Sequence, residues 1–500
     1  MKKIFLSLLT LAALNVQAQQ SELAMKYANT ITTDDLFDYL GILASDALEG
    51  RETGERGQRM AAALISHHFQ SEGLVAPVKN GDQMSYYQNV PLVSSKITKA
   101  YLKIGKKQYD NFNKTVFVGT GVTNGEMDTQ IVFVGNGDAA NYEGIDVAGK
   151  AVLLFTENNY RKTVSASKVA AEKGAKLVLV VRTSTDEMLE ELITSYRGYL
   201  EAGRMSVDTG IEADEYLGMF YTAPSLMKDL VGKNYEKLKE LTDNGSVSEI
   251  QKVKQGKFAF GIEKEVKKIK SENVMGYLEG TDLKDELVVI TSHYDHLGRR
   301  GDKIFNGADD DGSGTAGVME LAQAFAMAKA EGNGPRRSLL FLAFTGEEKG
   351  LLGSEYYADH PVFPLANTIT NLNMDMIGRN DEDNYKDKDY VCLVGSDKLS
   401  QELHDISEQV NATYTNLDLN YVYNDENHPE QIYYRSDHWN FAKNGIPVIF
   451  YTTGSHDDYH KETDTIEKIE KDVYLQRTKL VFYTAWELVN RDKRPALTVK

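Results

Sequence analysis

Hydrophobic and polar positions divide the chain into three stretches with different patterns. Near the N-terminus, Thr33 and the apolar residues that follow it at helical spacing predict a helix capped at Thr33. Residues 58–72 predict a second helix that ends at a glycine. Between residues 111 and 258, short β-rich segments alternate with glycine turns in the order strand, helix, strand. From residue 273 onward, apolar strands alternate with helical stretches, of which residues 314–329 are the clearest.

The last of these patterns predicts an α/β fold. Strands that are apolar along their whole length are typical of a mixed, mostly parallel sheet covered by helices on both faces. Four such strands are expected at residues 287–291, 339–344, 369–374 and 448–451. In sheets of this kind, functional groups gather at the carboxyl ends of the strands.

Three of these strands run directly into residues that can bind a metal ion. In chain order, they are the segment His293–His296, the pair Glu347 and Glu348, and Asp375. An acidic, glycine-rich loop at residues 306–314 lies between the first two and opens a predicted helix. Each element alone is usually a helix cap or a solvated group. Together at one sheet edge, imidazole and carboxylate groups indicate a site for zinc or a similar divalent ion.

Two neighbouring pairs suggest a division of roles. Of the adjacent Glu347 and Glu348, one can bind metal while the other accepts a proton from water as the general base. Asp295 lies two residues beyond His293 and is expected to accept a hydrogen bond from its imidazole, which would fix the ring.

Six segments, in a fixed order, carry a resemblance to a known family. They are SHYDHLG (292–298), NGADDDGSGTAG (306–317), RRSLLFLAFTGEEKGLLGSEYY (336–357), NLNMDMIGR (371–379), RSDHWNFAKNGIPVIF (435–450) and YHKETDT (459–465). The chain resembles the co-catalytic dizinc aminopeptidases, a family that also includes glutamate carboxypeptidase II and glutaminyl cyclases. The resemblance implies a zinc-peptidase (phosphorylase/hydrolase-like) sandwich.

The resemblance also implies two zinc ions per chain and a set of ligands. His293 and Glu348 would each bind one ion, and Asp310 would bridge both. Asp375 would join one ion and His460 the other. By residue type alone, the other aspartates of the triplet 309–311 remain alternatives to Asp310.

Further roles follow from the same resemblance. Glu347 would be the general base and Asp295 would orient His293, while Arg435 and Tyr459 would lie near the substrate. For the last histidine ligand, residue type alone leaves two alternatives to His460, which are His438 and His456.

The first residues of the chain predict export. Lys2 and Lys3 precede an apolar run at residues 4–14, and small residues at the spacing of a cleavage site lead to Gln19. We therefore expect residues 1–18 to be a signal peptide and the mature protein to be secreted or periplasmic. The apolar run is too short to span a bilayer, and no later stretch reaches that length.

The middle stretch is expected to form a separate domain. Its segments DVAGKAVLL (146–154) and AEKGAKL (171–177) resemble a protease-associated domain. The predicted organisation assigns residues 19–110 and 259–500 to the peptidase domain and residues 111–258 to this inserted, small β-rich domain. The lysine-rich stretch at residues 252–270 suggests a junction.

Net charge and cysteine content argue against nucleic-acid binding, a disulfide and a cysteine nucleophile. A net charge of −18 argues against non-specific binding to nucleic acid. Cys392 is the only cysteine, so an intrachain disulfide is excluded. Because it lies in an apolar, strand-like run, we expect a buried side chain and no nucleophile.

These features predict a secreted zinc exopeptidase that acts on peptides. The expected activity is that of an aminopeptidase, in which Glu347 activates a water held between two metal ions. A carboxypeptidase or dipeptidase is an alternative, since Arg299, Arg300 and Arg435 could bind a terminal carboxylate. A glutaminyl cyclase is a second alternative. A non-catalytic binding protein is the alternative from a different class, and the complete ligand set argues against it.

Overall fold

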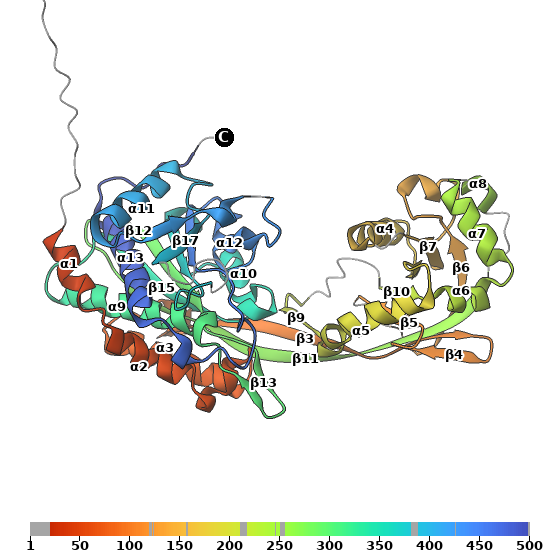
Figure 1. Ribbon diagram of the computed structural model, residues 1–500, viewed down its shortest axis with the longest axis horizontal. Coiled ribbons are helices and arrows are strands. Elements are labelled where there is room, and N and C mark those ends of the chain that lie inside the picture. The colour runs from red at the N-terminus through yellow and green to blue at the C-terminus, as the bar shows by residue number, and fades with distance from the viewer. Residues whose placement is uncertain are drawn as a thin grey trace, which may run out of the picture. The chain divides into compact units, whose positions relative to one another are not determined.

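The computed structural model divides the chain into two compact units. It describes residues 21–498 except 120–122, 124, 157–158, 211–217, 246, 251–255, 382–388 and 426. The first unit comprises Met1–Val90 and Lys270–Lys500, and the second comprises Pro91–Ile269 (Figure 1). The expected signal peptide, residues 1–18, lies outside the described residues.

The first unit contains a mixed, mostly parallel sheet. Its strands, in spatial order, are β18 (Asp418–Asn420), β17 (Tyr390–Val394), β19 (Val448–Thr452), β16 (Thr368–Met374), β12 (Leu283–His293), β15 (Arg337–Phe344) and the end of β11 (Lys257–Leu278). β12 is parallel to β15 and β16, β16 to β19, and β17 to β18. β11 and β15 are antiparallel, as are β17 and β19. The predicted α/β sheet is confirmed, and all four expected strands belong to it.

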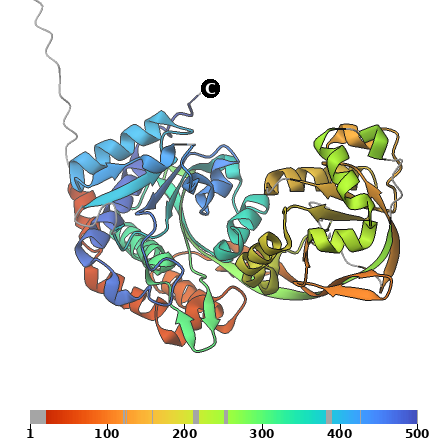
Figure 2. The same ribbon diagram turned by 45° about the vertical axis from the view of Figure 1, so that its right-hand side comes forward.

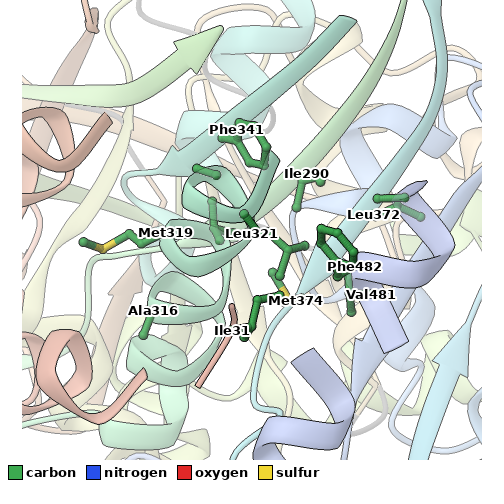
Figure 3. Close-up of a cluster of buried hydrophobic side chains, with 14 of the residues drawn as sticks. Ile31, Ile290, Ala316, Met319, Leu321, Phe341, Leu372, Met374, Val481 and Phe482 are labelled. Carbon is green, nitrogen blue, oxygen red and sulfur yellow. The ribbon is translucent and has the colours of Figure 1, made fainter. Parts of the chain in front are cut away.

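Alternating side chains along these strands face two hydrophobic cores. Val288 and Ile290 of β12 contribute to the larger core, whereas Leu287 and Val289 contribute to the smaller one. This alternation is a direct consequence of strand geometry, in which successive side chains point to opposite faces. Figure 3 shows the larger core, where Leu321 and Phe482 from two helices lie close to the strand residue Ile290. The sheet is therefore buried on both faces.

Helices cover both faces of this sheet (Figure 2). Those that contribute to the larger core are α1 (Glu22–Ala28), α2 (Thr33–Leu43), α3 (Arg56–Ser71), α9 (Gly314–Ala330), α11 (Gln401–Tyr414) and α13 (Lys471–Asn490). Those on the smaller core are α10 (Leu352–Asp359) and α12 (His438–Ala442). Two hairpins, β1 (Val78–Asn80) with β2 (Gln83–Ser85) and β13 (Gly298–Arg300) with β14 (Lys303–Phe305), complete the unit.

The predicted helices agree with the observed ones to within a few residues at each end. α9 begins at Gly314, as expected, and α3 is followed by Gly73 with a φ of +79°, a conformation that glycine favours after a helix. At α2 the N-cap is Thr32, whose side chain accepts a hydrogen bond from the Asp35 N–H at 3.1 Å, so this helix is capped one residue earlier than the pattern indicates.

One acidic side chain in the larger core has a consequence for stability. Glu320 lies on α9 and is 1% exposed. Burial, together with the negative charges of Asp35 and Glu72, raises the pKa of Glu320 to about 8. Because the folded state holds the proton more tightly than the unfolded chain, this group stabilises the fold fully at low pH. That contribution is lost as the pH rises toward about 8.

Glu320→Gln should remove this dependence on pH. The variant is expected to unfold at a temperature higher than the native protein by a few degrees at pH about 8, and the difference should shrink toward pH about 5. Thermal unfolding followed by circular dichroism across this range measures the effect, with the exposed Glu22→Gln as the control. Parallel curves for the native protein and the Glu320 variant would contradict the assignment.

The second unit has its own sheet and its own core. β6 (Met127–Phe133), β7 (Ala151–Phe155), β8 (Leu177–Val181) and β10 (Met219–Thr222) are parallel neighbours in this order, and β5 (Thr115–Val118) is antiparallel to β10. β3 (Tyr87–Ile104) pairs with β4 (Lys107–Asp110) and β9 (Arg204–Val207). The helices are α4 (Tyr160–Glu172), α5 (Asp186–Ala202), α6 (Pro224–Val231), α7 (Asn234–Asp243) and α8 (Val247–Ile250).

This unit extends beyond both ends of the expected domain of residues 111–258. The reason is that two long strands, β3 and β11, lead into it and out of it, and much of each belongs to it. The lysine-rich stretch that suggested a junction forms part of β11 from residue 257 onward. The unit also contains five α-helices among its described residues, so it is less β-rich than its sequence suggests.

Cys392 lies in the middle of β17 and is buried, as expected. Burial raises the pKa of its thiol to about 12, which argues against a thiolate nucleophile. Among the described residues, no helix combines the length and the apolar character that a membrane span requires.

Candidate metal centre

Four parallel strands of the first unit end at the same edge of the sheet. β12 ends in His293, and β16 is followed directly by Asp375. β15 leads into the loop that carries Glu347 and Glu348, and β19 leads toward His460. The parallel register of these strands is the reason that residues far apart in the sequence meet at this edge.

A first group of donor atoms surrounds the imidazole of His293. Its Nε2 lies 3.3 Å from Asp310 Oδ1 and 3.6 Å from Asp375 Oδ1, and all three side chains are buried. The other oxygen of Asp375 accepts a hydrogen bond of 2.7 Å from the Ser436 hydroxyl, which fixes this carboxylate. One imidazole nitrogen and two carboxylate oxygens are a donor set suited to zinc.

A second group lies on the opposite side of Asp310. His460 Nε2 is 3.1 Å from Asp310 Oδ2 and 3.2 Å from Glu348 Oε2. Asp310 therefore directs one oxygen to each group, as a bridging carboxylate would. Burial alone would raise the pKa of Asp310, but the contacts with His293 and His460 hold it well below its usual value.

The other two aspartates of the triplet accept hydrogen bonds from nearby N–H and O–H groups. Asp309 accepts hydrogen bonds from the Gly378 N–H at 2.7 Å and the Ser313 hydroxyl at 2.9 Å. Asp311 accepts from the Gly314 N–H at 2.8 Å, at the start of α9. Of the three, Asp310 is the one that contacts both His293 and His460.

The two alternative histidines lie elsewhere. His456 Nε2 is 3.2 Å from Asp309 Oδ2, and its Nδ1 faces Arg379. The buried ring of His438 stacks on Phe450 with a centroid distance of 4.6 Å. His460 is the histidine of this part of the sequence that contacts both Asp310 and Glu348.

Asp295 supports the site in a different way from the one expected. His293 Nδ1 lies 3.1 Å from the backbone oxygen of Asp295, and the carboxylate is farther away, at 3.8 Å. The carboxylate instead accepts hydrogen bonds from the Thr53 hydroxyl at 2.6 Å and from the Glu347 N–H at 3.1 Å. The Asp295 carbonyl therefore faces the ring, and its carboxylate holds the Glu347 backbone.

Glu347 lies between the donor groups and an open cleft. Its Oε2 is 3.9 Å from His293 Nε2, and burial together with the negative charge of Asp375 raises its pKa well above the usual value, although His293 opposes this shift. The cleft has a volume of about 530 Å³. Its walls include Glu347, Glu348, Leu351, Glu355, Tyr434, Arg435, Trp439 and Lys443.

Arg435 and Tyr459, the two expected substrate residues, meet near this cleft. Arg435 lines it and donates a hydrogen bond of 3.4 Å from Nη2 to the Tyr459 hydroxyl. The Tyr459 ring stacks on His460 with a centroid distance of 3.8 Å. Both side chains are therefore connected to the second donor group.

Sequence reasoning missed two residues of the centre. His296 is fully buried, and its Nδ1 lies 2.7 Å from Glu348 Oε1. The His-Tyr-Asp-His segment contained a signal, but strand alternation would direct His293 and His296 to opposite faces. β12 ends at His293, so this alternation does not continue to His296.

Arg51, from the N-terminal part of the chain, is the second missed residue. Its buried guanidinium donates hydrogen bonds to the backbone oxygens of Tyr294 and Gly307 at 2.8 and 2.9 Å, and to those of Leu43 and Asn306. Arg51 thereby ties the turn after β12 to the loop that carries Asp310. The signal in the sequence was a glycine-flanked arginine, which by itself has no distinctive chemistry.

The buried polar atoms of the centre fit a bound cation. Glu348 Oε1, Asp310 Oδ2 and both ring nitrogens of His296 lack a hydrogen-bond partner among the described residues. Buried donors and acceptors are normally paired, because leaving them unpaired is costly. Imidazole nitrogens and carboxylate oxygens are also the ligands that zinc takes in proteins. A divalent cation would satisfy the two carboxylate oxygens and one ring nitrogen of His296, its Nδ1.

The fold and the centre define an α/β protein with two adjacent groups of candidate metal ligands that share one aspartate, Asp310. Residues 273–485 match the model of Peptidase family M28.

Curated relatives match part of the chain. Aminopeptidase YwaD of Bacillus subtilis (strain 168) is 28% identical over 235 residues, which cover 45% of this chain and 46% of that protein. A probable glutamate carboxypeptidase, AMP1 of Arabidopsis thaliana, is 24% identical over 344 residues, or 62% of this chain and 47% of that protein. The chain spans about half the length of the curated relatives it matches.

Solved structures share the fold. The aminopeptidase from Aneurinibacillus sp. strain AM-1 has a TM-score of 0.57 at 20% identity and covers 95% of this chain and 98% of its own. The zinc aminopeptidase BSAP from Bacillus subtilis has a TM-score of 0.51 at 19% identity, with 93% of this chain and 98% of its own covered.

Proposed function

We propose that the protein is a secreted or periplasmic zinc aminopeptidase that removes N-terminal residues from peptides. The observation that carries the proposal is Asp310, whose two oxygens face two separate donor groups, beside Glu347 and an open cleft. The family match and the aminopeptidases among the relatives support the same reaction.

Two zinc ions fit the donor atoms of the centre. His293 and Asp375 would hold one ion, Glu348 and His460 the other, and Asp310 both. When bound, two zinc ions would polarise the scissile carbonyl and make water a stronger nucleophile at neutral pH.

Glu347 is the residue that moves the proton in this proposal. Its carboxylate accepts a proton from the attacking water and returns it to the amine that leaves. The hydrogen bond from its own N–H to Asp295 fixes the backbone of this residue. Burial raises the pKa of Glu347, which makes its carboxylate a stronger base.

The cleft contains groups that suit a peptide with a free N-terminus. Glu355 is a carboxylate of the cleft wall outside the donor groups, and it would attract the α-ammonium of the substrate. Trp439 and Leu351 provide apolar surface for a side chain. Tyr459, beside His460, would donate a hydrogen bond to the oxygen of the tetrahedral intermediate.

A carboxypeptidase or dipeptidase is the second candidate. Arg435 and Lys443 line the same cleft and could bind a terminal carboxylate. The probable glutamate carboxypeptidase among the relatives is consistent with this alternative.

Peptides with blocked ends distinguish the two reactions. We expect the zinc-loaded protein to release the first residue from peptides with a free N-terminus, including peptides amidated at the C-terminus, and to leave N-acetylated peptides intact. Mass spectrometry identifies the products. Cleavage of acetylated peptides combined with resistance of amidated ones would establish the carboxypeptidase alternative. No cleavage of any peptide would contradict both.

Two further parts of the proposal concern the remaining chain. Residues 1–18 would direct export and be removed before Gln19, which sequencing of the N-terminus of the exported protein tests. The second unit would be a protease-associated domain, as its glycine turns and strand order suggest.

A further inference from the structure

The buried side chain of His296 is held in place by its surroundings. Its backbone N–H donates a hydrogen bond of 3.1 Å to the Arg51 oxygen. On another side, Gly307 packs so closely that a Cβ at this position would lie 2.6 Å from the imidazole. Gly307 also has a φ of +56°, which glycine adopts without strain. The position of this ring is therefore determined by the fold.

Three atoms that could bind a metal ion lie close together here, and one of them belongs to this ring. His296 Nδ1 lies 2.7 Å from Glu348 Oε1 and 3.8 Å from Asp310 Oδ2, and donor atoms of the three residues all lie within 4.8 Å of one another. None of these three atoms has a hydrogen-bond partner among the described residues. The short distance between His296 and Glu348 is thus not an aligned hydrogen bond. Convergent, buried and unpaired donor atoms are what a cation site requires.

An imidazole lies beside each of the two carboxylate oxygens of Glu348. Oε1 faces His296, and Oε2 lies 3.2 Å from His460 Nε2. The two rings are 6.0 Å apart between centroids, and a nitrogen of each faces Asp310 Oδ2, at 3.8 Å for His296 Nδ1 and 3.1 Å for His460 Nε2. On the other side of Asp310, the first group contains one histidine, His293, among the residues that the structure describes.

We infer that His296 is a ligand of the ion held by Glu348 and His460, in addition to the expected five ligands. This inference rests on the proposed two-zinc centre. The position beside Glu348 then has two imidazoles and two carboxylates, while the position beside His293 has one imidazole and two carboxylates. Because the richer donor set binds zinc more tightly, the position beside Glu348 fills first, and the centre binds its two ions with different affinities.

The His296→Asn variant tests whether His296 binds the metal ion or only donates a hydrogen bond. The asparagine amide can donate a hydrogen bond from a place close to that of Nδ1, but it lacks the imidazole nitrogen that zinc prefers. We expect the first zinc ion to bind at least about 100-fold more weakly, a loss at or above the upper end of the 10–100-fold range for residues that only support a ligand. Competition with a chromophoric chelator measures this affinity.

X-ray absorption of the native protein loaded with a single zinc ion gives a second measurement. The inference requires two imidazoles around that ion, and it does not depend on whether the variant folds. A single imidazole in the native protein, or native zinc affinity in a folded His296→Asn variant, would overturn it.

His68→Asn is the matched control. His68 is also a buried histidine of the first unit, and its Nε2 lies 2.8 Å from the Met319 oxygen, away from the centre. Zinc affinity should remain unchanged in this variant. If the native protein binds zinc with two imidazoles but cleaves no peptide, the ligand inference stands and the proposed activity fails. If it binds no zinc, both fail.

Discussion

Glu347→Gln is expected to lower kcat by about 10²–10⁴-fold, the range that a general base contributes, while the protein keeps both zinc ions. Glutamine has nearly the same shape but cannot accept the proton of the attacking water. Glu347 Oε2 lies 3.9 Å from His293 Nε2, so its replacement breaks no hydrogen bond to this imidazole. Zinc content should therefore be unaffected.

Steady-state hydrolysis of an aminoacyl anilide, together with metal analysis of the same sample, tests this expectation. KM should change much less than kcat if Glu347 acts mainly in the transition state. The exposed Glu467→Gln serves as the control and should behave as the native protein. Near-normal turnover in Glu347→Gln would exclude this residue as the base.

Asp310→Ala is expected to have an equally large effect by a different route. Asp310 contributes one oxygen to each donor group, so its removal takes a ligand from both. At low free zinc the variant should retain at most one ion, and peptide hydrolysis should fall to the background rate. Loss of the shared carboxylate also leaves His293 and His460 without their common partner.

Dialysis against a weak chelator followed by metal analysis measures the zinc content. Asp309→Asn is the matched control, because the asparagine oxygen can still accept the hydrogen bonds from the Gly378 N–H and the Ser313 hydroxyl. This variant should keep both ions. Two tightly bound ions in Asp310→Ala, or full activity of the native protein with one ion, would refute the bridging role.

Local patterns were sufficient to predict much of the first unit. The segments 287–291 and 339–344 are apolar along their whole length, which predicts strands of a sheet that is buried on both faces. β12 and β15 are strands of this kind. The same reasoning predicted that polar residues at the strand ends share one edge. Cys392 was correctly expected in the interior for the same reason, because its neighbours are apolar.

The boundaries of the second unit were less predictable. Long strands such as β3 and β11 have no turn signal where one compact unit ends and the next begins. A pattern based on glycine turns therefore placed the limits at the nearest turns, inside the actual unit.

Within the centre, residue type and order determined by themselves that a histidine and carboxylates would meet at the ends of β12, β15 and β16. Tertiary structure alone decided which atoms meet. Asp309 and Asp311 are chemically identical to Asp310, and only the path of the loop turns Asp310 between His293 and His460. The reason is that ligand choice depends on direction, which sequence spacing does not specify in a loop.

The same limit explains His296 and Arg51. His296 lies in a segment noticed for its neighbour His293. Both His296 and Arg51 act through contacts between residues far apart in the chain. Hydrophobic periodicity is a local property, and the sequence alone therefore determined the sheet and the kind of chemistry at its edge. The orientation of each donor atom depends on long-range packing, so only the folded chain decided that His296 faces Glu348.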